Sequence, residues 1–127
     1  MRALVATVEG VFEVDLDSEE VETADGEVVP QQVVTGLPRV ICSAAAGSTV
    51  AAVVETKPPL MVSHDAGRTW RESGRGLPAG FAVAVSEDDP DLIVFAGRNR
   101  LYVSRDGGLF WHAVDVELPD VLAVAVD

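Results

Sequence analysis

The sequence is poor in cysteine and has no long apolar run. Cys42 is its only cysteine, so no disulfide can form within the chain and nothing indicates an oxidising compartment. We expect Cys42 to be a small buried side chain. No segment reaches the roughly 18 apolar residues of a transmembrane helix, and Glu9 follows the N-terminus too early for a signal peptide. These absences predict a cytoplasmic protein without a membrane partner.

Basic residues are also scarce. Nine Lys and Arg residues, of which only Lys57 is a lysine, stand against 21 Asp and Glu residues, and the net charge is −12. Such a field repels a phosphate backbone, so we exclude nucleic acid as a partner. An acidic, lysine-poor composition is typical of proteins from salt-accumulating halophiles, in which salt screens the repulsion between carboxylates. An ordinary acidic cytosolic protein is the alternative.

Hydrophobic residues make up 48% of the 127-residue chain, which is enough to build a core and excludes intrinsic disorder. They lie in short valine-rich segments separated by Gly, Pro and Asp. Apolar and polar residues alternate over residues 12–16, and no segment keeps a helical period through three turns. The pattern predicts an all-β fold in a single domain that spans residues 1–127.

The chain repeats itself with an offset of 41 residues, which places residues 50–70 over 91–111 and residues 78–85 over 119–126. A fainter third copy covers residues 4–14, and Leu-Pro pairs at 37–38, 77–78 and 118–119 mark the start of each unit. A period near 41 residues with about four strands per unit is the spacing of a β-propeller blade. We place the repeats at residues 1–38, 39–78 and 79–118, with residues 119–127 as the innermost strand of a further blade.

One motif lies at the same place in two repeats. Residues 63–70 read Ser-His-Asp-Ala-Gly-Arg-Thr-Trp, and residues 104–111 read Ser-Arg-Asp-Gly-Gly-Leu-Phe-Trp. The first matches in full the S-X-D-X-G-X-T-W Asp-box of the bacterial neuraminidase (BNR) repeat family, and the second lacks only the threonine. The chain resembles this family over nearly its whole length, although residues 15–35 depart from the pattern. The resemblance implies a β-propeller, and the residues that carry it are Ser63, Asp65, Gly67, Thr69, Trp70, Ser104, Asp106, Gly108 and Trp111.

We expect these residues to have structural roles. Gly67 and Gly108 supply a positive φ in the hairpin between the third and fourth strands of a blade. The Asp and Ser side chains accept backbone N–H groups across the turn, and each Trp fills the gap between adjacent sheets. No catalytic role is expected for Asp65 or Asp106, because such turns in the resembling family lie on the face opposite the ligand channel.

The order of strands predicts how the chain assembles. With A as the innermost strand of a blade and D as the outermost, the chain runs B-C-D, A-B-C-D, A-B-C-D, A. The A strands are residues 39–46, 80–86 and 121–127, the B strands 2–7, 50–55 and 91–96, and the C strands 11–16, 60–64 and 101–105. Three blades leave terminal sheets exposed, so we expect residues 121–127 of one chain to complete the blade begun by residues 3–16 of another. Two chains would then form a six-bladed homodimer; a fragment of a longer single-chain propeller is the alternative.

The loops expected at the central channel are rich in basic residues. The candidate ligand-binding residues are Arg39, Lys57, Arg75, Arg98, Asn99 and Arg100. A basic mouth on an acidic body would attract an anionic ligand. The alternative is that these side chains pair locally with acidic neighbours, namely Glu9, Glu55, Glu117 and Asp120.

The sequence holds no complete set of catalytic or metal-binding residues. A sialidase-like site, which the resemblance suggests, needs a tyrosine nucleophile, and the only tyrosine, Tyr102, falls on a strand where packing is expected. His64 and His112 occupy non-equivalent repeat positions, so we expect neither a metal nor a cofactor. We predict a non-catalytic binding or scaffold module for a protein or a small anionic ligand. A carbohydrate-binding or glycosidase-like propeller is the alternative, and the wider resemblance to photosystem II assembly factors and sortilin-type receptors implies protein or peptide binding.

Overall fold

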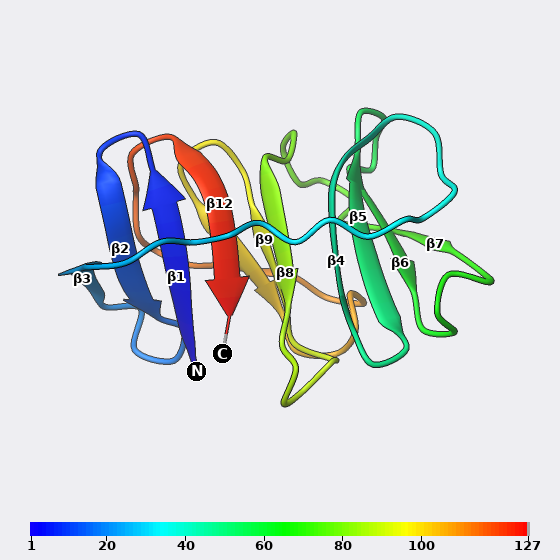
Figure 1. Cartoon of the computed structure of the whole chain (residues 1–127), viewed down its shortest axis with the longest axis horizontal. Helices are drawn as coiled ribbons and strands as arrows, with labels where there is room; N and C mark the ends of the chain where they lie inside the picture. Colours follow the sequence, from blue (N-terminus) through cyan, green and yellow to red (C-terminus); the bar gives the residue numbers. More distant parts are fainter. Residues whose placement is uncertain (127) are drawn as a thin grey trace.

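A computed structural model describes residues 1–126 as twelve β-strands in three four-stranded antiparallel sheets. The all-β prediction is confirmed. These residues form no helix, and hence none that could cross a membrane. Sheet I has the order β12-β1-β2-β3, sheet II the order β4-β5-β6-β7 and sheet III the order β8-β9-β10-β11 (Figure 1). The strands are β1 (Arg2–Thr7), β2 (Gly10–Asp15), β3 (Val21–Ala24), β4 (Val40–Ala46), β5 (Thr49–Val54), β6 (Leu60–Ser63), β7 (Arg71–Ser73), β8 (Ala82–Val85), β9 (Ile93–Ala96), β10 (Leu101–Ser104), β11 (His112–Ala113) and β12 (Val121–Val126).

The predicted strands agree with the observed ones to within two residues at each end. The agreement arises because short runs of β-branched residues are bounded by glycine, proline and aspartate, which end a strand locally. Asp127, which the prediction includes in the last strand, lies outside the described residues.

Sheet III lies between the other two sheets. Strands β12, β8 and β4 come together in the middle of the molecule, with β8 packed against both of the others. Figure 1 shows sheets I and II spreading to opposite sides of this centre. Strands β3, β7 and β11 are the edges that lie farthest from it in their sheets.

Strand β12 completes sheet I within the same chain. It pairs with β1 in an antiparallel register that joins Ala3 to Val126 and Val5 to Val124. This corrects the prediction that residues 121–127 pair with another chain. After β11 the chain returns to the middle of the molecule, where the edge of β1 lies next to it, and pairing there satisfies backbone groups that would otherwise stay open.

The connection between β3 and β4, residues 25–39, leads from sheet I to sheet II. It is longer than the equivalent connections, residues 74–81 and 114–120, and it crosses in front of β12, β8 and β4 (Figure 1). Ser43 Oγ donates to the Val33 carbonyl at 3.0 Å and accepts from the Val33 N–H at 2.8 Å. Since Ala44 packs against sheet III, Ser43 faces the opposite side. The segment therefore covers part of the side of sheet II that is turned away from sheet III.

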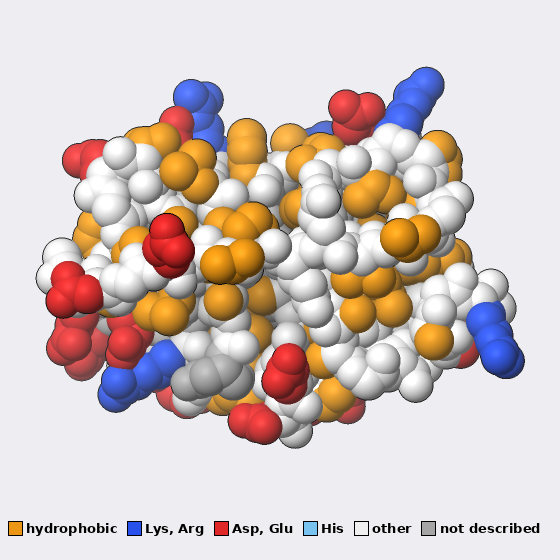
Figure 2. Space-filling view, viewed as in Figure 1, with side chains coloured by type: hydrophobic (Ala, Val, Ile, Leu, Met, Phe, Trp, Pro, Cys, Tyr) orange, Lys and Arg blue, Asp and Glu red, His pale blue; other side chains and the backbone are white. Residues whose placement is uncertain are grey.

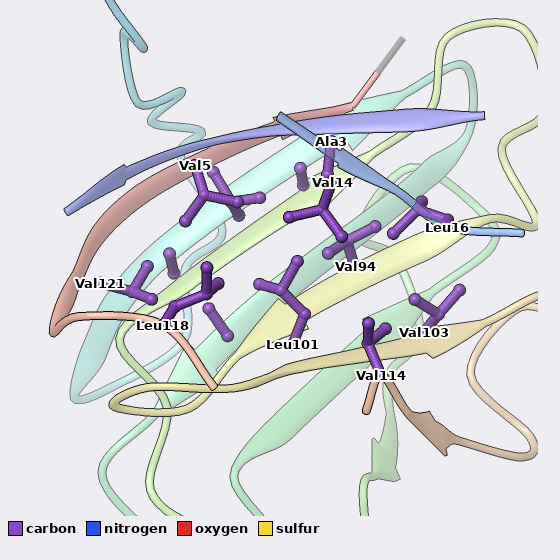
Figure 3. Close-up of a cluster of buried hydrophobic side chains, with 14 of the residues drawn as sticks. Ala3, Val5, Val14, Leu16, Val94, Leu101, Val103, Val114, Leu118 and Val121 are labelled. Carbon is purple, nitrogen blue, oxygen red and sulfur yellow. The ribbon is translucent and has the colours of Figure 1, made fainter. Parts of the chain in front are cut away.

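Two apolar cores join the sheets. The core between sheets I and III contains Val5, Val14, Val94 and Leu101 (Figure 3). The core between sheets II and III is built around Phe95, which is fully buried with β5 and β6 side chains against it. Burying one large aliphatic or aromatic side chain contributes about 1.5–3 kcal/mol, so these two layers hold the three sheets together.

Candidate functional site

The first turn motif, residues 63–70, is a closed network around one carboxylate. Ser63 Oγ donates to Asp65 Oδ1 at 2.7 Å and accepts from the Gly67 N–H at 2.8 Å. Asp65 also accepts from the Thr69 N–H at 2.8 Å and from the Thr69 hydroxyl at 2.6 Å. Gly67 has φ 88°, the left-handed backbone that glycine adopts without strain. Each defined residue of the motif except Trp70 thus takes part in shaping the hairpin.

The second turn motif, residues 104–111, repeats this network without the threonine. Ser104 Oγ donates to Asp106 Oδ1 at 2.8 Å and accepts from the Gly108 N–H at 2.8 Å. The Phe110 N–H donates to Asp106 Oδ1 at 3.0 Å, but the phenylalanine ring offers no hydroxyl for the second oxygen.

Both aspartates are held in the charged form. The Thr69 hydroxyl, followed by the Thr69 N–H, lowers the pKa of Asp65 far below its ordinary value, and the Phe110 N–H lowers the pKa of Asp106. A carboxylate that accepts several hydrogen bonds is a poor proton donor at neutral pH. The geometry therefore favours structural roles for Asp65 and Asp106.

A pH-dependent stability follows from this network. Because the folded-state pKa of Asp65 lies below the ordinary value of 3.8, its contribution is present above that value and is lost as the pH falls through the folded-state pKa. Asp65→Asn is expected to lower the free energy of unfolding at neutral pH and to flatten its decline below about pH 4. Urea unfolding at a series of pH values measures this, with Asp88→Asn in the exposed β8–β9 turn as the control. Parallel pH curves for wild type and Asp65→Asn would contradict it.

Trp111 fills the gap between sheets II and III. Its indole Nε1 donates to Ser73 Oγ at 3.0 Å, and Ser73 Oγ donates to the Gly108 carbonyl at 2.6 Å. Its ring meets Phe95 edge-on, with centroids 6.2 Å apart. Trp70, the equivalent residue in sheet II, belongs to neither core and has no such bond within residues 1–126. The two tryptophans are equivalent in sequence but differ in their surroundings.

Sheet I has a different turn at the equivalent place. Asp15 Oδ1 accepts from the Asp17 N–H at 2.9 Å and the Ser18 N–H at 3.0 Å. The Arg105 guanidinium, from the second turn motif, donates to the Leu16 carbonyl at 3.2 Å. The turn that lacks the motif is thus held by its own aspartate and by the neighbouring sheet.

A groove runs along β7, and we call it the β7 groove. It consists of a pocket of about 230 Å³ and an adjoining one of about 250 Å³, which share Pro58 and Arg75. Its lining residues are Lys57, Pro58, Val62, 71–77 and 107–109. One wall is the outer strand of sheet II, and the other is the second turn motif of sheet III.

The β7 groove is basic on an acidic protein. Lys57, Arg71 and Arg75 make no ion pair within the described part of the chain. Arg71 shares a face of β7 with Ser73, which reaches Gly108. Glu72 also lines the groove, although strand alternation turns its side chain to the other face of β7. Figure 2 shows acidic side chains gathered around sheet I at one end of the molecule and basic ones projecting at both ends. The arrangement can hold a carboxylate, sulfate or phosphate group.

The six candidate ligand-binding residues do not form one site. Lys57 and Arg75 line the β7 groove, and Arg39 lines a separate, largely apolar pocket of about 490 Å³. Arg98 pairs with Asp120 at 3.3 Å and Asn99 donates to Glu117 at 3.3 Å, as the alternative of local pairing predicts. Arg100 lines none of these pockets, and its carbonyl accepts from the Gly97 N–H at 2.9 Å.

Sequence reasoning missed Arg71. The six candidate ligand-binding residues all lie in loops expected at the channel, whereas Arg71 lies in β7 directly after the first turn motif. Its spacing of two residues from Ser73 places both on one face of a strand. The sequence contains this spacing, but only the structure shows that Arg71 and Ser73 both line a groove.

Other reactive groups offer no site. The Tyr102 ring packs on Phe95, with centroids 5.9 Å apart. Burial raises the pKa of the Cys42 thiol to about 11, so this half-buried side chain stays protonated at neutral pH. Among residues 1–126 no cluster of His, Cys, Asp and Glu is placed to hold a metal ion. Comparison with family models and with curated proteins gives no match for the chain.

Proposed function

We propose that the chain is a non-catalytic binding module of the Asp-box β-propeller type, which holds an anionic group of a protein or small ligand in the β7 groove. The observation that carries the proposal is the presence in one groove of three cations that make no ion pair among residues 1–126, in a protein with net charge −12. The three four-stranded sheets and the two turn networks support the family resemblance. The cytoplasm remains the proposed location.

The sialidase-like alternative draws no support from the site. Tyr102, the only tyrosine, packs against Phe95, and the motif aspartates are held ionised by their own turns. General acid catalysis at neutral pH needs a raised pKa. A binding role asks only for the charges and the concave shape that the β7 groove has.

Anion binding is testable with simple probes. Phosphate, citrate and sialic acid are each expected to raise the thermal midpoint if they occupy the groove, because a ligand that binds only the folded state stabilises it. Arg75→Ala is expected to weaken binding about tenfold, a typical loss for one charged partner, as measured by calorimetry at low salt. Arg98→Ala, which removes an exposed cation outside the groove, is the matched control. Equal affinities for all three proteins, or no binding of any anion, would contradict the proposal.

We also propose that a second copy of the chain covers the open side of sheet II and completes a ring of six sheets. Trp70 supports this, since Trp111 in the same repeat position is covered by a neighbouring sheet that supplies a hydrogen-bond acceptor. Two identical arcs related by a two-fold axis would cover each other's open sheets. Because β12 already pairs with β1, such a dimer would form by packing of faces without exchange of strands.

Trp70→Ala tests this assembly. It is expected to convert dimers into monomers in sedimentation equilibrium with little change in fold, because its ring lies outside both cores. Trp111→Ala is expected to destabilise the fold itself by about 3 kcal/mol or more. A wild-type chain that stays monomeric at every protein and salt concentration would contradict the proposal.

A further inference from the structure

We propose that the occupant of the β7 groove is an extended acidic segment of a partner protein, which adds a strand to the edge of β7. This inference rests on the proposed anion-binding function and names its ligand. Five consecutive residues, 71–75, line the pocket of about 230 Å³ in the groove. The cavity therefore lies along β7 (Arg71–Ser73) and the two residues that follow it.

The edge of β7 is open to pairing. It is the last strand of sheet II, and within residues 1–126 it pairs with β6 alone, through Leu60 with Ser73 and Val62 with Arg71. An edge strand leaves alternate N–H and C=O groups without a ladder partner, and an extended peptide can satisfy them. Such bonds give affinity to any sequence, so the side chains along the edge must select the partner.

Charge distinguishes β7 from the other two outer edges. Strand β3 contains Glu22 and is flanked by Glu20 and Asp25, so it repels an acidic segment. Strand β11 has only two residues, and its His112 contacts Glu19 at 3.3 Å. Strand β7 contains Arg71 and Glu72 and is followed by Arg75. Its two arginines outnumber the one carboxylate and make no ion pair among the described residues. Of the three edges, β7 is the one that attracts carboxylates.

The wall of the groove also exposes apolar side chains. Leu109 lines the pocket and is 60% exposed, and its neighbour Phe110 is 78% exposed. Phe110 takes the place of the motif threonine, so an apolar ring stands where the first turn motif has a hydroxyl. Side chains of an added strand alternate between its two faces. An added strand that continues sheet II therefore carries Asp or Glu at every second position, on the face that meets Arg71, with Val or Leu at the positions between them.

The test uses an end-capped heptapeptide, Val-Asp-Val-Glu-Val-Asp-Val, and calorimetry on the full chain at low salt. Binding is expected, with a loss of about tenfold or more for Arg71→Glu and no change for Arg98→Glu, which reverses an exposed charge outside the groove. A peptide with the same side chains but alternate backbone nitrogens methylated is expected to lose binding, because it cannot pair with β7. Unchanged near-ultraviolet circular dichroism verifies that each variant is folded.

The outcomes separate this inference from the proposed function. Equal affinity for the methylated peptide would overturn strand addition while leaving an anion-binding groove. Binding of citrate or phosphate but not of the heptapeptide would likewise overturn strand addition and leave an anion-binding groove. Self-association of the chain that Arg71→Glu abolishes would make a second copy the occupant and overturn the foreign partner. Failure of the peptide and of all small anions would remove both proposals.

Discussion

Val124→Asp is expected to unfold sheet I or to lower the free energy of unfolding by on the order of 4 kcal/mol, the cost of an uncompensated buried charge. Val124 is 4% exposed in β12 and pairs with Val5 in the core between sheets I and III. A carboxylate there loses its water and finds no basic partner in that core. The variant therefore measures how far the whole chain depends on the return of β12 to β1.

The same strand supplies the control. Leu122 is 61% exposed, so Leu122→Asp is expected to change stability by about 0.5 kcal/mol or less, as for most surface substitutions. Urea unfolding followed by circular dichroism measures both variants. Equal effects of the two substitutions would contradict the observed burial of β12, and so would a fully stable Val124→Asp.

Phe95→Ala is expected to cost about 3–5 kcal/mol, because it removes a large side chain from the centre of a core and leaves a cavity. Phe95 is fully buried, and its ring meets both Tyr102 and Trp111. Loss of the ring also removes one support of Trp111 between sheets II and III. The loss is expected in thermal and urea unfolding alike.

Phe81→Ala is the matched control, since Phe81 is 47% exposed and its loss is expected to cost about 1 kcal/mol or less. Gly80→Ala adds volume to the core from which Phe95→Ala removes it. The added Cβ would overlap the Phe95 ring and lie 2.7 Å from Val53 Cγ1. Overpacking of this kind costs about 1–3 kcal/mol. If Phe95→Ala relieves that clash, the double variant will lose less than the sum of the two single losses.

The strands and turns were predictable because their determinants are local. Alternation over residues 12–16 placed β2, and the motif residues of 63–70 and 104–111 form the hydrogen bonds expected of them. The positive φ of Gly67 and Gly108 follows from the same turn chemistry. Local signals of this kind do not depend on where the neighbouring sheets lie.

Long-range pairing was less predictable. The repeat alignment places Val53 over Val94, yet Val53 pairs with Leu60 while Ala96 pairs with Leu101. The two strands are thus shifted by two residues, which loops of different length absorb and which keeps the same side chains facing the core. The partner of β12 was also assigned to another chain, because sequence periodicity cannot tell a partner within the chain from an identical one outside it.

The site was predictable only in part. Lys57 and Arg75 fall in the β7 groove, but Arg98 and Asn99 are engaged by acidic neighbours across their loops. Residue type and loop position indicate which cations could bind a ligand. Whether such a cation is already engaged in an ion pair depends on which carboxylate the fold brings beside it, as Asp120 is brought beside Arg98.

The pairing of β1 with β12 has a consequence for the order of folding. Sheets II and III are each built from consecutive strands, so both can form while the chain is still being synthesised. Sheet I contains three of the earliest strands and the last one described, and its register joins Ala3 to Val126. Contacts so distant along the chain form slowly, because the loop must close before it gains any contact energy. Sheet I is therefore expected to be the last of the three to be completed, and the acidic residues of β2 and β3 oppose edge-to-edge association of its early strands.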